Sequence, residues 1–111
     1  MTLSTHVLDA TSGRPAPNVA LTLHRRAETE GWDPIGEGVT DEDGRCRTLA
    51  PDSLQAAVYR LDFNTGAYFV ATGQQGFYPE VSIVFEVTEP TRHYHVPLLL
   101  SPFAYSTYRG S

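Results

Sequence analysis

The segment Arg92–Ser111, RHYHVPLLLSPFAYSTYRGS, decides the fold that this sequence predicts. Within it, Thr91 to Leu100 is typical of a β-strand, Ser101-Pro102 of a turn, and Phe103 to Tyr108 of a second strand near the last residue. Chain ends are usually polar and frayed, whereas this one is dense in aromatic, histidine and arginine side chains. We therefore expect a terminal β-hairpin that carries a polar site.

Working back from this hairpin, the rest of the chain is typical of six further strands and one short helix. The strands are expected at residues 3–9, 19–25, 32–40, 45–49, 58–64 and 80–87, with turn-forming residues between them. Thr65 to Thr72 predicts the helix, begun by Asn64 or Thr65 and ended by Gly73. Short strands with at most one helix indicate an all-β, antiparallel β-sandwich.

Alternation along the strands predicts which side chains leave the core. From Leu3 to Val7 every second residue belongs to the apolar face, which leaves Ser4 and His6 on the opposite face. Near the end of the chain, His95 shares its face with His93 by the same parity. The strand pattern therefore directs these polar side chains outward.

Length and charge limit the class of protein. The 111 residues suit a single domain spanning residues 1–111. A domain of this size buries about 65% of its surface, which leaves little chain to enclose a deep pocket, so a small-molecule site shared between subunits is expected. A net charge of −5 without a basic run argues against nucleic-acid binding. No apolar run approaches the ~18 residues of a membrane span.

The residue types present exclude several chemistries. All eight basic residues are arginine, so a lysine Schiff base and a lysine-dependent phosphate loop are excluded. Cys46 is the single cysteine, which rules out a disulfide within the chain. The opening residues MTLSTHVLD lack the pattern of a secretory signal, so we expect a cytoplasmic protein, provided that Met1 is the native start.

Two histidines and one arginine are candidates for chemistry. His6 and His95 suit proton transfer because imidazole titrates near neutral pH; each has the alternative of being an exposed or locally hydrogen-bonded strand residue. Arg45 follows the acidic turn at residues 41–44 and has the alternative of being a solvated surface charge. That turn hints at calcium, yet Arg45 occupies a ligand position of an EF-hand loop and no helices flank it, so we interpret it as a turn.

Two further arrangements leave alternatives open. Cys46 lies between Arg45 and Arg47, which would lower the pKa of a thiol, but a small buried side chain is the interpretation that we favour. His93 and His95 form an H-x-H pair that, together with His6, would supply the three nitrogens of a catalytic zinc site.

Five segments resemble the transthyretin-related 5-hydroxyisourate hydrolases. They are LSTHVLDATSGRPAPNVALTL from residue 3, VTDEDGRC from 39, YRLDFNTGAYF from 59, HYHVPLLLSP from 93 and YRGS from 108. They occur in the family's order and span essentially the whole chain. The resemblance implies the transthyretin fold, with two four-stranded sheets and a short helix after the fifth strand. It also implies a homotetramer whose active sites lie in the channel between dimers.

The same resemblance implies an activity and a set of functional residues. The activity is hydrolysis of 5-hydroxyisourate to 2-oxo-4-hydroxy-4-carboxy-5-ureidoimidazoline in urate breakdown, without metal or cofactor. The matching positions are catalytic His6, His95 and Ser111, and substrate-binding Arg45, Tyr108 and Arg109. Gly110 is expected to let the chain bend and bring Ser111 inward.

Three alternatives follow from the fold alone, since fold does not fix function. The first is a non-catalytic small-ligand carrier like transthyretin, which lacks the YRGS ending and the histidine and arginine set found here. The second is a sandwich module of an extracellular adhesin. The third is a hydrolase of another cyclic amide or ureide.

Overall fold

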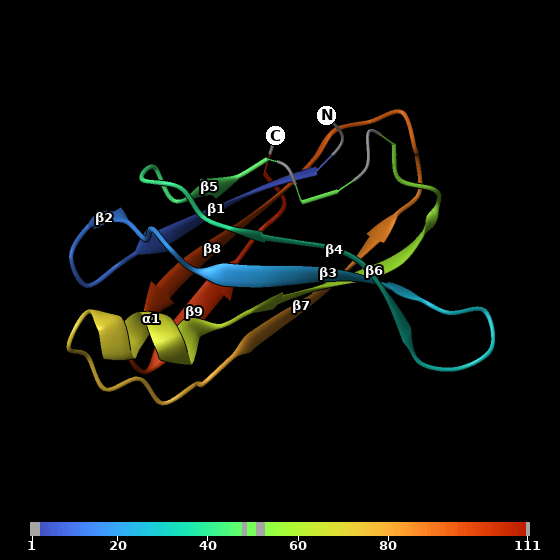
Figure 1. The fold of residues 1–111 in the computed structure, drawn as a ribbon. Coiled ribbons are helices and arrows are strands. Elements are labelled where there is room, and N and C mark those ends of the chain that lie inside the picture. The colour runs from blue at the N-terminus through green and yellow to red at the C-terminus, as the bar shows by residue number, and fades with distance from the viewer. Residues whose placement is uncertain (1–2, 48, 51–52, 111) are drawn as a thin grey trace.

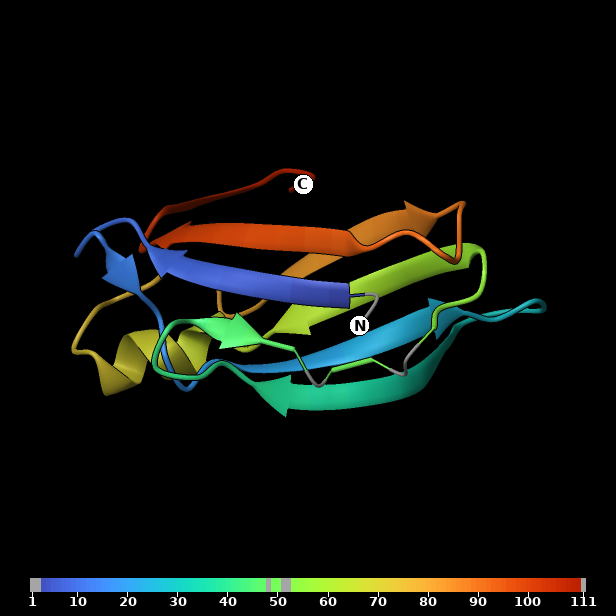
Figure 2. The ribbon, with the colours of Figure 1, turned by 90° about the horizontal axis from the view of Figure 1, so that it is seen from above.

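The computed structural model describes residues 3–47, 49–50 and 53–110 as two β-sheets packed face to face, with one short helix at one end (Figure 1). Seen from above, β1 and β8 lie over β3 and β4 as separate layers (Figure 2). The apolar faces of the strands meet between the layers, as the alternation predicts.

The first sheet has the order β2-β1-β8-β9, and β5 pairs with the same edge of β1 as β2. Its strands are β1 (Leu3–Asp9), β2 (Arg14–Pro15), β5 (Arg45–Cys46), β8 (Tyr94–Ser101) and β9 (Ala104–Thr107). The central strand β1 therefore has β5 on one side and β8 on the other. This arrangement decides which outward side chains become neighbours.

The second sheet has the order β4-β3-β6-β7. Its strands are β3 (Ala20–Arg26), β4 (Trp32–Val39), β6 (Ala57–Phe63) and β7 (Val81–Val87), all paired antiparallel. Leu23, Leu61 and Phe63 are completely buried against the first sheet. Burying such a side chain contributes about 1.5–3 kcal/mol, so these alternating positions supply much of the driving force for packing.

The predicted all-β sandwich with one short helix is confirmed, but the first sheet differs from the prediction. It has five strands instead of four, because segment 11–18, predicted as a loop, contributes the short strand β2. It is also not wholly antiparallel, since β1 and β8 run parallel, from Leu3 opposite Tyr94 to Asp9 opposite Leu100. These two strands are far apart in sequence, so no hairpin turn dictates their direction.

The remaining strands begin and end within a few residues of the predicted positions. The largest difference is at the predicted strand 45–49, where β5 covers only Arg45–Cys46 and Thr48 lies outside the described residues. Strand ends are set by pairing partners that are distant in sequence.

The helix α1 (Thr65–Ala71) forms where it was predicted. The side chain of Asn64 accepts a hydrogen bond from the backbone N–H of Ala67 at 3.2 Å, which confirms Asn64 as the N-cap. Gly73 follows the helix with φ of 72°, a conformation that favours glycine. The hydroxyl of Tyr68 donates to Asp9 at 2.7 Å and so ties the helix to the first sheet. Among the described residues, no helix has the length and apolar character to cross a membrane.

Candidate active site

Three neighbouring strands bring three of the predicted site residues onto one face. His6 on β1 lies opposite Arg45 on β5, and Ser4 on β1 lies opposite His95 on β8. Their inward neighbours Thr5 and Val96 are buried, which confirms that these positions point away from the core. The outer face of the first sheet therefore carries His6, Arg45 and His95 together.

The spacing of the two histidines follows from strand geometry. His6 pairs with Pro97, two residues beyond His95 on the same strand. With strands ~4.8 Å apart and a rise of ~3.3 Å per residue, the Cα atoms of His6 and His95 are separated by roughly 8 Å. A small planar molecule fits within reach of both rings.

His95 is held by Ser4, a residue that was not predicted as part of the site. The Oγ atom of Ser4 lies 2.8 Å from Nδ1 of His95 and 3.0 Å from Nε2 of His93. Ser4 itself is 9% exposed, so this hydroxyl is largely shielded from water. Alternation placed Ser4 on the face of His6, but its pairing with His95 depends on a strand register that no local pattern contains.

The surroundings of His95 keep its imidazole neutral. Burial is the main cause of a lowered pKa for His95. The positive charge of Arg45 and electrostatic interactions with His6 and His93 lower this pKa further, while a hydrogen bond with the backbone of Ser4 acts in the opposite direction. The neutral ring has a nitrogen lone pair available near neutral pH, as a general base requires.

His6 offers a second unused nitrogen on this face. Its Nε2 atom is buried and has no hydrogen-bond partner among residues 3–47, 49–50 and 53–110. Buried polar atoms in native proteins nearly always have a partner. A water molecule or a bound polar molecule would satisfy this nitrogen.

Gly110 packs directly on His95. The backbone N–H of Gly110 donates to the carbonyl of His95 at 2.9 Å, and a Cβ atom on Gly110 would lie 2.4 Å from Cδ2 of the imidazole. Gly110 has no positive φ. Glycine is required here for a steric reason, because only glycine leaves room for the ring, and the expected bend toward Ser111 stays a prediction.

The turn before Arg45 is built by Asp41. Its carboxylate accepts hydrogen bonds from the backbone N–H groups of Asp43 at 2.9 Å and Arg45 at 3.0 Å. The bond from Arg45 is the main reason for the lowered pKa of Asp41. This carboxylate is thus engaged in the turn, which agrees with the interpretation of the segment as a turn rather than a calcium loop. Cys46, next to Arg45, is 3% exposed, and the favoured interpretation of a buried cysteine is confirmed.

Two of the other predicted residues at the end of the chain lie beside His95, and the third cannot be described. The guanidinium of Arg109 lies 5.1 Å from the ring centre of Tyr94, a side chain of the inward face. Tyr108 is 59% exposed, and together with Arg109 and His95 it lines a groove of about 300 Å³ against residues 83–86 of β7. The structure therefore brings Tyr108 and Arg109 to His95, while His6 and Arg45 are not part of this groove's lining. Ser111 lies outside the described residues.

The alternative of a zinc site has no matching geometry in the part of the chain that the structure describes. There, no three histidine, cysteine, aspartate or glutamate side chains are grouped so that they could hold a metal ion. The H-x-H pair at 93 and 95 instead meets at the hydroxyl of Ser4.

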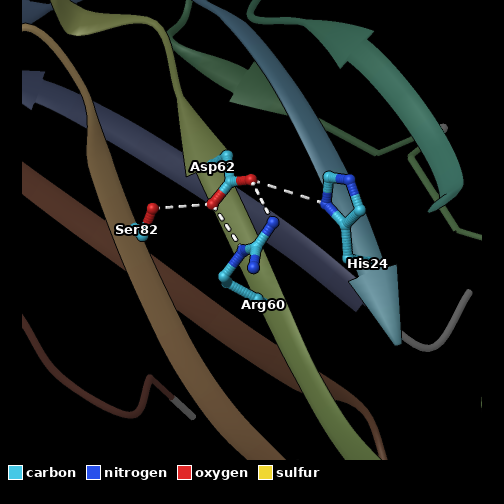
Figure 3. A network of polar contacts seen from close by, with 4 residues as sticks. All are labelled: His24, Arg60, Asp62 and Ser82. Atoms are coloured by element: carbon cyan, nitrogen blue, oxygen red, sulfur yellow. Dashed lines mark hydrogen bonds and ion pairs between the residues drawn. The ribbon is translucent and has the colours of Figure 1, made fainter. Parts of the chain in front are cut away.

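A second polar cluster lies on the other sheet, where three side chains surround the carboxylate of Asp62 (Figure 3). The carboxylate of Asp62 accepts from Ser82 at 2.7 Å and from two nitrogens of Arg60, each at 2.9 Å. His24 approaches the same carboxylate at 3.5 Å. The nearby charges and hydrogen bonds outweigh the effect of burial, and the pKa of Asp62 is lowered. With its carboxylate saturated, this cluster is suited to holding β3, β6 and β7 together.

Comparison with known proteins gives the family. Residues 3–110 match the model of the HIUase/Transthyretin family. A 5-hydroxyisourate hydrolase of Mus musculus is 46% identical over 111 residues, which cover 98% of this chain and 94% of that protein. The structure of Klebsiella pneumoniae 5-hydroxyisourate hydrolase superposes with a TM-score of 0.86 at 38% identity. The match covers 100% of this chain and 100% of that one.

A transthyretin structure superposes with a higher TM-score. Sea bream transthyretin in complex with thyroxine superposes with a TM-score of 0.94 at 38% identity, covering 99% of this chain and 95% of that one. The resemblance found in the five sequence segments is thus confirmed over nearly the whole length. The chain belongs to the HIUase/Transthyretin family.

Proposed function

We propose that this protein hydrolyses 5-hydroxyisourate to 2-oxo-4-hydroxy-4-carboxy-5-ureidoimidazoline, a step of urate degradation. The observation that carries the proposal is the register of β5, β1 and β8, which sets His6, Arg45 and His95 on one outer face. Relatives such as the Mus musculus protein, 46% identical, bear the name 5-hydroxyisourate hydrolase. Together these support a hydrolase with two imidazoles and one fixed cation in its site.

In the proposed reaction, water attacks a ring carbonyl that is flanked by nitrogen. His95 takes a proton from this water, because its lowered pKa keeps the imidazole neutral. A C–O bond forms, the ring C–N bond breaks, and His6 donates a proton to the departing nitrogen. Positioned acid–base groups of this kind contribute about 10²–10⁴-fold to a rate. The reaction needs no covalent intermediate with the protein and no metal.

Arg45 supplies the positive charge that complements an anionic substrate. Its guanidinium never deprotonates and pairs with planar anions through parallel hydrogen bonds. From β5, next to His6, it would hold the anionic substrate and stabilise the negative charge that develops on the attacked carbonyl oxygen.

Tyr108, Arg109 and Ser111 are proposed to complete the site from the end of the chain. Gly110 anchors this end at His95, and Ser111 is the next residue in sequence. Ser111 is proposed to orient a histidine or the substrate, and Tyr108 and Arg109 to contact the substrate.

We further propose a homotetramer with active sites at the interface between dimers. The support is that His6, Arg45 and His95 lie on an outer sheet face, which a second copy would have to cover to exclude water from the reaction. The 111 residues would act as a single domain within it. The cytoplasmic location expected from the sequence is also proposed, and a single buried cysteine is compatible with it.

The carrier alternative is not favoured. Shape alone does not separate the two functions, since the superposition scores for sea bream transthyretin and the Klebsiella hydrolase are 0.94 and 0.86. What weighs against a carrier is the polar character of the candidate site, where His6, with an unpartnered nitrogen, lies between the cation Arg45 and His95, whose lowered pKa favours the neutral ring.

The test is an ultraviolet absorbance assay in which urate oxidase generates 5-hydroxyisourate in the cuvette. Its decay is followed with and without this protein, and with a chelator in parallel. We expect decay well above the spontaneous rate and no effect of the chelator. A spontaneous rate in the presence of folded protein would refute the hydrolase, and activity lost to the chelator would refute the metal-free mechanism.

A further inference from the structure

We propose that Ser4 is a positioning residue for this reaction: its hydroxyl holds His95 in the Nδ1–H tautomer, so that Nε2 carries the lone pair that accepts the proton from water. The inference rests on the proposed function for its purpose. Its structural part, the tautomer of one imidazole, can be measured without any substrate.

The geometry defines which nitrogen of His95 is engaged. Ser4 Oγ lies 2.8 Å from Nδ1 of His95, a hydrogen-bond distance, and both residues belong to a paired position of β1 and β8. Gly110 packs against Cδ2 and Cγ of the same ring. The ring is therefore fixed from two sides, with Nδ1 committed to Ser4.

The count of donors and acceptors allows two arrangements of protons, and the proposed role of His95 decides between them. A serine hydroxyl has one proton to donate and lone pairs that accept. Ser4 Oγ also lies 3.0 Å from Nε2 of His93. If the Ser4 proton goes to His93, then Ser4 accepts the Nδ1–H of His95, and both bonds are made with both rings neutral. This leaves Nε2 of His95 unprotonated, which is the form a general base needs.

The opposite assignment would disable His95. If Ser4 donated to Nδ1 of His95, the ring proton would sit on Nε2 and no lone pair would remain for water. His93 would then have to donate to Ser4 through Nε2. The first arrangement is therefore the one compatible with the proposed role of His95 as base.

The charged and titratable groups around His95 are consistent with a hydroxyl, rather than a carboxylate, as the hydrogen-bond partner that sets its tautomer. The groups that act on it are His6 from β1, Arg45 from β5 and His93, which immediately precedes β8. The end of the chain presents the backbone of Gly110 and, in the groove that His95 lines, Tyr108 and Arg109. In many sites a carboxylate on one imidazole nitrogen sets the tautomer, and it also raises the pKa of the ring. A neutral hydroxyl orients the ring without adding negative charge.

The test measures the tautomer directly. Protein labelled with ¹⁵N at histidine is studied by long-range ¹H–¹⁵N NMR above the ordinary imidazole pKa of about 6.5. The His95→Asn variant identifies the signals of His95 among the four histidines. We expect the Nδ1–H tautomer in the wild type and in Ser4→Thr. In Ser4→Ala we expect a shift towards the Nε2–H tautomer that free histidine favours.

Ser82→Ala is the matched control, since it removes a serine hydroxyl bonded at 2.7 Å on the other sheet. It should leave the His95 signals unchanged. An Nε2–H tautomer in the wild type, or the same tautomer in Ser4→Ala as in the wild type, would overturn the proposal. Because this measurement needs no substrate, its outcome is separate from that of the hydrolase assay.

Kinetics supply the functional arm. Ser4→Ala should lower kcat by about tenfold, the effect of losing one ordinary hydrogen bond, with little change in KM. Ser4→Thr should recover most of the rate. A change in KM without a change in kcat would contradict a role through His95. A stable Ser4→Thr variant that recovers none of the rate would contradict it as well.

Discussion

The backbone of Gly110 lies against the imidazole of His95 so closely that a methyl group in place of hydrogen would come within 2.4 Å of Cδ2. The same residue donates a backbone hydrogen bond to the His95 carbonyl at 2.9 Å. The end of the chain and the candidate base thus form one packed unit. A change at residue 110 must displace the ring, the tail or both.

Gly110→Ala should therefore reduce activity more than stability. Because β9 and the tail are exposed, the tail can move away at small cost, yet the ring loses its orientation. We expect at least a tenfold lower kcat, on the order of the penalty for a misplaced catalytic group, and a shift of less than about 1 kcal/mol in unfolding free energy.

Gly31→Ala is the control for this substitution. Gly31 has a positive φ of 86° and no atom near its missing side chain, so alanine there is strained without touching the site. It should cost about 1–2 kcal/mol and leave the rate unchanged. If Gly110→Ala is as active as Gly31→Ala, the contact with His95 has no functional role.

The acid limb of the pH–rate profile should report His95. Burial lowers the pKa of this imidazole, and the charge of Arg45 lowers it further. Protonation removes the lone pair, so kcat/KM should fall as the pH drops through a value below the ordinary ~6.5. Arg45→Gln removes the nearby cation, which raises the pKa of His95 and moves this limb to higher pH.

The control is Arg47→Gln, the same change two residues along in the sequence at an exposed arginine. It should leave the midpoint of the limb where the wild type has it. A midpoint that is unmoved in Arg45→Gln, or moved to lower pH, would contradict the electrostatic contact between Arg45 and His95.

Asp9 should contribute to stability through its hydrogen bonds. Although burial acts to raise its pKa, bonds from Tyr68 and from nearby backbone N–H groups outweigh this, and the pKa is lowered below 3.8. A carboxylate with a depressed folded-state pKa stabilises the protein above the unfolded pKa, and this contribution is lost as the pH falls through the folded value. Asp9→Asn should thus flatten the acid dependence of unfolding.

At neutral pH, Asp9→Asn should lower the unfolding free energy by about 1–3 kcal/mol. The carboxylate accepts hydrogen bonds at both of its oxygens, whereas an amide has only one oxygen that can accept. Denaturant unfolding measures the change. Asp33→Asn, at an exposed position of β4, is the control and should stay within about 0.5 kcal/mol of the wild type. Equal effects of the two variants would show that the bond to Tyr68 adds nothing to the stability of the fold.

The local sequence pattern was sufficient to predict the strands, the helix and the face on which each side chain lies. Alternation placed His6 and His95 outward, and the Asn64 cap and Gly73 marked the helix, because these signals act over a few residues. The buried state of Cys46 followed in the same way.

Pairing between distant strands was not predictable in this way. Nothing near Ser4 indicates that β1 runs parallel to β8 and meets His95, since register is settled by the packing of the whole sheet. Likewise, the motif match of Arg109 does not reveal that its guanidinium lies over Tyr94, beyond the end of β9 where strand parity no longer applies.

The most direct test of the central claim compares His95→Asn with His24→Asn in the 5-hydroxyisourate decay assay. Both variants replace one strand histidine with asparagine, but His24 lies on the other sheet beside Asp62. We predict a loss of about 10²–10⁴-fold for His95→Asn, the usual contribution of a general base, and wild-type activity for His24→Asn. Equal activity of the two folded variants would contradict the assignment of His95 to catalysis.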